Sequence, residues 1–219
     1  ILECGFDGVI GAGGGYVEIG NQMLYHKKVT KEAVNHMVDY FEANNFDYYV
    51  ESNGGLFASK NLVSHLERII YGDIDHDPAA RARRDKKDNH FINAMIEGQN
   101  LRRDDINKAC FLENPAIAFD DIITEFKDEF NVIHCTVPMF GKDSGELSVP
   151  NIHKANAIET LINYLQIDRK NTYAFGDGIN DKEMLEYVNV GIAMGNAVDE
   201  LKEVADEVTG DIDRDGIYN

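Results

Sequence analysis

This chain of 219 residues is poor in cysteine and in basic residues, and it lacks long apolar runs. Its three cysteines, Cys4, Cys110 and Cys135, are odd in number and show no CxxC spacing. We therefore expect reduced thiols with a structural role and a cytoplasmic location. No apolar run reaches the length of a membrane span, and no secretory signal is evident, so the sequence predicts no membrane insertion.

The shortage of positive charge narrows the possible partners. Lysine and arginine total 21 against 39 acidic residues, which gives a net charge of −18. Such a chain is repelled by nucleic acid and by anionic lipid, so we expect neither as a partner. A phosphorylated ligand would need a local cation, because charges are screened over about 8 Å. The apolar fraction of 43% is typical of a globular protein with a core that needs no disulfides.

Three familiar site patterns are missing or incomplete. The histidines show no zinc-ligand spacing. The glycines of 11–15 do not fit a dinucleotide loop, because the third glycine would fall on Tyr16 and a hairpin pattern follows; a glycine-lined turn near a ligand cleft is the better interpretation. The acidic segment 211–216 resembles half of a calcium loop without its closing glutamate. A calcium-binding acidic module stays as an alternative.

The ends of the chain suggest a larger polypeptide. The sequence begins at Ile1 without a methionine and ends at Asn219, just after an acidic loop that contains glycine. We interpret both ends as cuts through a longer protein.

The periodicity of the chain predicts two kinds of architecture. The last third alternates strand and helix tightly, which is typical of a parallel α/β sheet, in the order helix 155–165, strand 172–175, helix 181–188, strand 190–193, helix 199–205 and strand 207–209. The middle has runs of strands with helices interspersed, which suggests an α+β domain. We therefore predict an α/β fold, with a Rossmann-like parallel-sheet core built from 1–21 and 142–219 and an inserted α+β domain at 22–141.

The segment 172–184 contains the closest grouping of candidate ligand side chains. A short buried strand ends at Phe175, and Gly176 and Gly178 allow the sharp turn that follows. That turn gathers Asp177, Asn180 and Asp181 at the carboxyl end of the strand. One aspartate would suffice as a helix cap, so two carboxylates and an amide favour a site for a cation or a polar ligand.

Lys154 is a second candidate. It begins the helix 155–165, at the end where the helix dipole is already positive. Lys154 could simply be a solvated lysine. The alternative is that it binds phosphate or carboxylate together with the free N–H groups of the helix. This interpretation gains weight if the loop 176–181 belongs to the same sheet.

Taken in order, Lys154, Gly176-Asp-Gly-Ile-Asn-Asp181 and Val190–Asn196 resemble the haloacid dehalogenase superfamily, and more narrowly its Cof-type phosphatases with a large inserted C2-type cap. The stretch 7–15, the strand Val208-Thr209 and the loop Asp215-Gly216 fit the same pattern. The resemblance implies that 1–21 and 142–219 form the family's core, without its N-terminal part, and that 22–141 form the cap.

The resemblance also implies an activity. It would be a Mg²⁺-dependent phosphomonoester hydrolase that acts on a small phosphorylated metabolite, such as a sugar phosphate, through an aspartyl-phosphate intermediate. Asp177 and Asp181 would hold Mg²⁺, Asp181 directly or through water. Asn180 would bind phosphate or substrate, and Lys154 would neutralise the nucleophile and the phosphoryl oxygens. The catalytic residues would thus be Lys154, Asp177 and Asp181, in a monomer or weak homo-oligomer.

The family's first motif, D-x-D-G-T, is absent. Gly5 stands two residues before Asp7, where the nucleophile would be, and Val9 replaces the threonine. The Ser/Thr motif that follows D-x-D-G-T in the family is missing too. We expect both motifs to lie upstream of Ile1. We therefore predict an active full-length phosphatase and an inactive 219-residue chain. The alternatives are a non-catalytic binding or regulatory protein of the same fold and, within the family, a phosphomutase.

Overall fold

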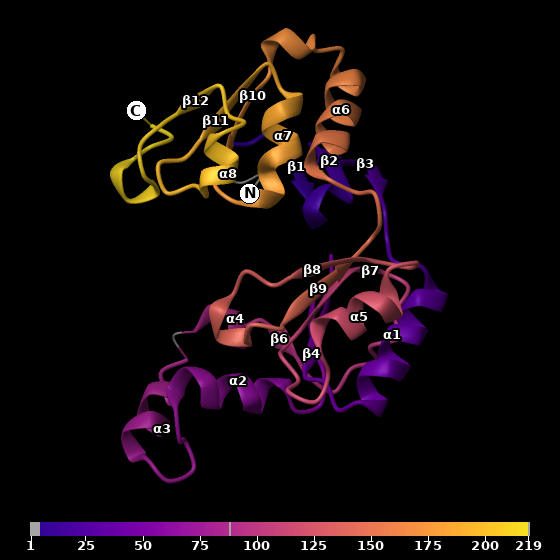
Figure 1. Ribbon diagram of the computed structural model, residues 1–219, viewed down its shortest axis with the longest axis vertical. Coiled ribbons are helices and arrows are strands. Elements are labelled where there is room, and N and C mark those ends of the chain that lie inside the picture. The colour runs from indigo at the N-terminus through magenta and orange to yellow at the C-terminus, as the bar shows by residue number, and fades with distance from the viewer. Residues whose placement is uncertain (1–4, 88, 219) are drawn as a thin grey trace. The chain divides into compact units, whose positions relative to one another are not determined.

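The computed structural model describes residues 5–87 and 89–218 and divides the chain into two compact units (Figure 1). The terminal unit combines Ile1–Lys27 with Asn151–Asn219, and the inserted unit is Lys28–Pro150. These limits lie some residues away from the expected 22–141. That the terminal unit is a catalytic core and the inserted unit its cap stays a proposal.

In the described part of the inserted unit, six strands form one sheet in the order β6-β5-β4-β7-β9-β8. All neighbouring pairs are antiparallel except β5 and β6. The strands are β4 (Tyr48–Ser52), β5 (Gly55–Ala58), β6 (Met95–Ile96), β7 (Ile106–Phe111), β8 (Asn131–His134) and β9 (Gly145–Ser148).

Both faces of this sheet carry apolar clusters. Tyr48 and Val50 point to one cluster and Tyr49 to the other, as the two-residue period of a strand requires. The first face packs against α1 (Lys31–Ala43) and α5 (Phe119–Phe126). The second cluster includes residues of α2 (Leu62–Tyr71), α3 (Pro78–Asp85) and α4 (His90–Asn93).

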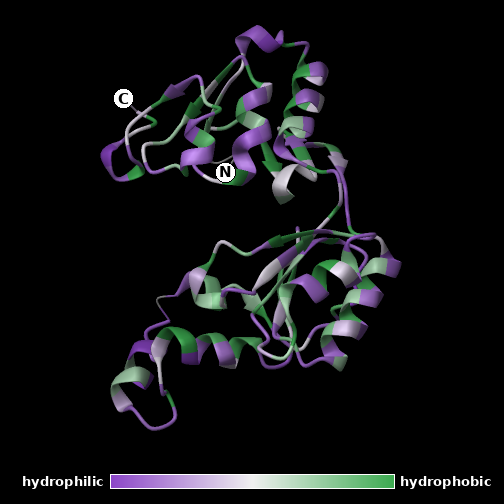
Figure 2. Cartoon of the chain, viewed as in Figure 1, coloured by the Kyte–Doolittle hydropathy of each residue, from purple (hydrophilic) through white to green (hydrophobic). Residues whose placement is uncertain are grey.

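The helix α1 shows how sequence sets local structure. Thr30 caps it, and its side chain accepts a hydrogen bond from the N–H of Ala33 (3.3 Å). Along its length, apolar and polar bands alternate, because one side enters the core (Figure 2). Phe41 is completely buried and contacts the rings of Phe46 and Phe111.

Two local expectations need correction. The pair Asn114-Pro115, a capping residue followed by a first-turn proline, is a sequence pattern that predicts a helix start. However, α5 begins at Phe119, because the side chain of Asn114 accepts from the N–H of Ala116 (3.1 Å) and donates to the carbonyl of Asn44 (2.9 Å). The strong charge of the segment 73–89 predicts a solvated loop or a fraying helix, but the segment contains the defined helix α3. Asp77 caps it by accepting from the N–H of Ala79 (2.8 Å).

The terminal unit contains two small sheets. The hairpin expected over 16–25 is confirmed, and the strands β1 (Gly8–Gly11), β2 (Tyr16–Ile19) and β3 (Gln22–His26) form an antiparallel sheet. The alternation of strands and helices is also confirmed, and it produces a parallel sheet in the order β10-β11-β12. Its strands are β10 (Tyr173–Gly176), β11 (Val190–Ala193) and β12 (Glu207–Val208), with helices α6 (Lys154–Leu165), α7 (Lys182–Tyr187) and α8 (Asp199–Lys202).

Only one face of this parallel sheet is well covered in the described residues. Ala174 and Ala193 pack into a cluster with Leu185 from α7 and Leu201 from α8. On the other face, Tyr173 is 66% exposed and Phe175 is 39% exposed. Among the strands of residues 5–87 and 89–218, β10 pairs with β11 alone, which makes it an edge strand there. Parallel sheets normally have both faces covered, so the exposure of this face is unusual.

Among the helices of residues 5–87 and 89–218, none is both long enough and apolar enough to cross a bilayer.

We expect the inserted unit to lose stability as the pH rises through the pKa of His36. Its ring lies between Glu129 (2.5 Å) and Glu125 (2.8 Å) of the segment around α5. The hydrogen bond to Glu129 is the main cause that raises the pKa of His36 above its ordinary 6.5. The ion pairs therefore stabilise the fold fully below pH 6.5, and their contribution disappears as His36 deprotonates above that value.

The measurement is urea unfolding across the pH range from 5 to 9 (roughly the range in which histidine titrates). His36→Gln should flatten the fall of the unfolding free energy above pH 6.5, while the exposed His90→Gln should keep the wild-type slope. An identical pH profile for His36→Gln and wild type would contradict the assignment.

Candidate functional site

The predicted site residues meet at the carboxyl edge of the parallel sheet. The ends of β10 and β11 are neighbours, with Gly176 opposite Ala193. The loops that follow are joined by the N–H of Met194, which donates to the carbonyl of Gly176 (2.9 Å), and by the N–H of Val198, which donates to the carbonyl of Asp177 (3.2 Å). Open α/β sheets bind ligands at this edge.

Asp181 is the structural centre of the loop after β10. It is 4% exposed, and one carboxylate oxygen accepts the N–H groups of Asp177 (3.1 Å) and Gly178 (3.3 Å). The other oxygen bonds to the ammonium group of Lys154, at the start of α6. A buried carboxylate with these partners is compensated, whereas removal of one partner would leave an unpaired charge. The structure thus brings together Lys154 and Asp181, which lie 27 residues apart in the sequence.

The glycine at 176 is required by this arrangement. A β-carbon at Gly176 would lie 2.6 Å from the β-carbon of Asp181 and 2.9 Å from Leu185. Only a residue without a side chain lets the strand end approach the carboxylate so closely.

Asp177 and Asn180 lie on the outside of the same loop. Both are exposed, and the Asp177 carboxylate makes no hydrogen bond or ion pair with any residue that the structure describes. The Asn180 amide leans back over the chain, with its oxygen 2.6 Å from the point where a β-carbon of Gly178 would lie. The carboxylate of Asp177 is therefore available to a ligand, while that of Asp181 serves to hold the loop and Lys154.

The glycine-rich turn 11–15 supports Lys154 from the other side. Gly14 has φ +110°, and a β-carbon there would lie 2.4 Å from the carbonyl oxygen of His153 and 3.0 Å from the nitrogen of Lys154. The hydroxyl of Tyr25 donates to the carbonyl of Gly14 (2.6 Å). The sequence predicted a turn near a ligand cleft. It did not indicate that this turn packs against the first residues of α6.

Gly195 and Asn196, which the sequence indicates only as part of the stretch 190–196, complete this edge of the sheet. The Asn196 amide oxygen accepts the N–H of Ile212 (3.0 Å), which joins the loops after β11 and β12. A β-carbon at Gly195 would lie 2.7 Å from the nitrogen of Asp211, so glycine permits this approach. A Gly-Asn pair one residue after the end of a strand was the signal in the sequence.

The acidic segment 211–216 has a structural explanation. Asp211 caps a short 3₁₀ turn by accepting from the N–H of Asp213 (3.1 Å). Within residues 5–87 and 89–218, the one group of side chains close enough together to share a metal ion is Cys110, Cys135 and Glu146. The aspartates of 211–216 do not form such a group.

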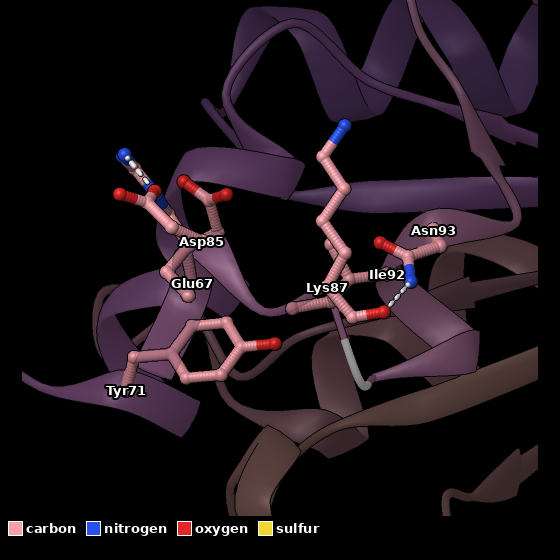
Figure 3. A pocket seen from close by; sticks show the side chains of 7 residues that line it. Glu67, Tyr71, Asp85, Lys87, Ile92 and Asn93 are labelled. Carbon is pink, nitrogen blue, oxygen red and sulfur yellow. Dashed lines mark hydrogen bonds and ion pairs between the residues drawn. The ribbon is translucent and has the colours of Figure 1, made fainter. Parts of the chain in front are cut away.

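A cavity of about 240 Å³ lies in the inserted unit (Figure 3). Its wall comes from α2, α3 and α4 and the segment between the last two, with Glu67, Tyr71, Arg84, Asp85, Lys87, Ile92 and Asn93. Arg84 is paired with Asp85 (2.8 Å), and Asn93 donates to the carbonyl of Lys87 (2.6 Å). None of the predicted site residues lines this cavity.

Known proteins are similar to this chain in sequence and in fold. The family model of haloacid dehalogenase-like hydrolases matches residues 1–219. Phosphatase YwpJ of Bacillus subtilis strain 168 is 26% identical over 229 aligned residues, which cover 95% of this chain and 76% of YwpJ. YkrA of the same organism is 59% identical over 64 residues, which amount to 29% of this chain and 25% of YkrA.

The fold comparison agrees. The structure of the sugar phosphatase BT4131, of haloacid dehalogenase subclass IIB, superposes with a TM-score of 0.67 at 19% identity, over 99% of this chain and 75% of that one. The parallel sheet β10-β11-β12 with its helices therefore agrees with a Rossmann-like α/β fold. The chain belongs to the haloacid dehalogenase-like hydrolase family.

The contact between Gly14 and α6 yields a matched pair of variants. Gly14→Ala should lower the unfolding free energy of the terminal unit by about 2–4 kcal/mol, because it adds a backbone clash to a disfavoured φ. Gly13→Ala has a positive φ of 62° but nothing within 4 Å of the added carbon, so it should cost only about 1–2 kcal/mol. Urea unfolding of both variants measures the difference. Equal losses would contradict the close approach to His153.

Proposed function

We propose that the protein containing this chain is a Mg²⁺-dependent phosphomonoester hydrolase that acts on a small phosphorylated metabolite. The observation that supports this most directly is the pairing of Lys154 with Asp181 beside an Asp177 carboxylate that has no partner among the described residues. Family membership supports the same reaction class. A sugar phosphate is the substrate class we favour, in line with the activity named for BT4131.

The donor set suits a hard divalent cation. Asp177 offers exposed carboxylate oxygens, which are the ligands that Mg²⁺ prefers. Asp181 would support the ion through water or directly, since its oxygens also hold two N–H groups and Lys154. Bound there, Mg²⁺ would neutralise charge on the transferring phosphoryl group. Lys154, Asp177 and Asp181 together carry one net negative charge, so a divalent cation would make the site attractive to phosphate.

The chain's own residues would then position the substrate. The Lys154 ammonium, fixed by Asp181 at the first turn of α6, would neutralise phosphoryl oxygens and the nucleophile. Asn180 would donate its exposed amide to phosphate or substrate. Phosphoryl transfer depends mainly on positioning and charge neutralisation, which is what this loop supplies.

We propose that the attacking aspartate comes from a segment outside these 219 residues. The D-x-D-G-T pattern does not occur in the sequence. The open edge of β10, together with the exposed Tyr173 and Phe175, suits a further strand that would pair with β10 and deliver an aspartate next to Asp177. That aspartate would form the aspartyl-phosphate, which water then hydrolyses. The terminal unit would be the catalytic core, and the inserted unit the cap that selects substrates.

Phosphate release with Mg²⁺ tests the proposal on two proteins. The 219-residue chain should release no phosphate from sugar phosphates above buffer, because the nucleophile is absent. A longer polypeptide that includes the residues encoded upstream should release phosphate. EDTA should abolish this activity, and Mg²⁺ should restore it. Turnover by the 219-residue chain would contradict an external nucleophile, and an inert longer polypeptide carrying D-x-D would favour a non-catalytic binding protein.

Variants of the longer polypeptide test the residue roles. Asp177→Asn and Lys154→Met should each lower kcat/KM by about 10²–10³-fold, because each removes charge that stabilises the transition state. Asp168→Asn and Lys170→Met serve as matched controls, since these exposed residues pair with one another before β10 (3.0 Å) and should stay within about twofold. A wild-type rate for Asp177→Asn would exclude it as the metal ligand.

A further inference from the structure

A pair of thiols lies in the sheet of the inserted unit. Cys110 is in β7, directly opposite Glu146 of β9, and Cys135 follows β8, where its N–H donates to the carbonyl of Ser144 (3.1 Å). The two sulfur atoms are 3.9 Å apart, with the Cys110 thiol donating to the Cys135 sulfur. Both are free cysteines, 25 residues apart, which are brought together only by the strand order β7-β9-β8.

The two thiols have different surroundings. Cys110 is 1% exposed and belongs to the apolar cluster of the second sheet face, whereas Cys135 is partly exposed at the margin of that cluster. The hydrogen bond from Cys110, helped by the N–H of Val137, lowers the pKa of Cys135 to about 7. The hydrogen bond to Cys135 and burial raise the pKa of Cys110. One thiol is therefore accessible and nucleophilic, and the other is a buried neighbour within contact.

The adjacent charges are already paired. Glu146 lies within 4.8 Å of both sulfur atoms, but its carboxylate accepts from the ammonium of Lys108 (2.9 Å). Lys108 is also 3.9 Å from Glu51. A lysine beside the carboxylate opposes a cation at this position. On the pKa of Cys135 the two charges act in opposite directions, since Glu146 raises it and Lys108 lowers it. The arrangement thus suits thiol chemistry better than a metal site.

We propose that Cys135 and Cys110 form a reversible oxidation site that responds to hydroperoxides. The Cys135 thiolate attacks a peroxide oxygen, so that an S–O bond forms, the O–O bond breaks and the leaving oxygen departs as water or alcohol after taking a proton. The Cys110 sulfur then attacks the resulting sulfenic acid. An S–S bond forms, the S–O bond breaks, and water leaves with the Cys110 proton. The two thiols lose two electrons to the peroxide, and the disulfide joins β7 to the segment after β8.

Hydrogen peroxide added to the reduced protein tests the site. Intact mass and non-reducing peptide maps should show a disulfide between the peptides that carry Cys110 and Cys135, reversible with dithiothreitol. Cys4→Ser is the matched control and should keep the cross-link. Cys135→Ser should abolish it, and Cys110→Ser should leave a sulfenic acid on Cys135 that dimedone traps. A peroxide-treated protein whose Cys110 and Cys135 stay reduced, or link only to Cys4, would overturn the proposal.

Alkylation kinetics provide a second readout that does not depend on disulfide formation. In Cys4→Ser, the labelling of Cys135 by iodoacetamide should rise with pH with a midpoint near 7, so that it is about tenfold slower at pH 6 than at its plateau. Cys110→Ala should move that midpoint upward, because it removes the thiol donor. A midpoint for Cys135 in the ordinary range of a free thiol would overturn the nucleophilic role. So would one Zn²⁺ ion per chain that survives dialysis and protects both thiols from peroxide.

Discussion

The local structure of the terminal unit depends on the hydrogen bonds and the ion pair of the buried Asp181 carboxylate. Charge at 4% exposure is tolerable only with good partners, and here the partners are two loop N–H groups and the Lys154 ammonium. This single side chain therefore shapes the loop after β10 and fixes the start of α6. Asp177, on the outer side of this loop, is exposed, and its carboxylate has no partner in residues 5–87 and 89–218. The edge of the sheet at which we propose that a cation and a phosphate bind is thus built around one buried charge.

Close backbone approach is the second constraint on this edge. Gly14, Gly176 and Gly195 each occupy a position where a β-carbon would clash with a neighbouring segment. They allow the turn 11–15, the loop after β10 and the loops after β11 and β12 to converge on a small area. Ligand sites at the carboxyl ends of parallel strands need such convergence, because short loops must reach a common centre.

The inserted unit follows a different rule, since its sheet is apolar on both faces. The alternation of Tyr48, Tyr49 and Val50 divides the strand between two clusters. Cys110 belongs to the second cluster, which explains its burial. Cys135 lies at the margin of that cluster, next to the ion pair of Lys108 and Glu146. The hydrogen bond between the two thiols raises the pKa of Cys110, helped by its burial, and lowers the pKa of Cys135.

The sequence by itself determined the α/β class, the hairpin of β2 and β3, and the loop of Asp177, Asn180 and Asp181, because strand and helix periods and glycine turns are local signals. It could not place the start of α5, since the Asn114 amide prefers a tertiary contact with Asn44 over a cap. Only the tertiary structure decided that Asp181 is the buried partner of Lys154 while Asp177 is exposed, and that Cys110 meets Cys135. These contacts span 27 and 25 residues, and they arise from strand order and burial, which no local pattern encodes.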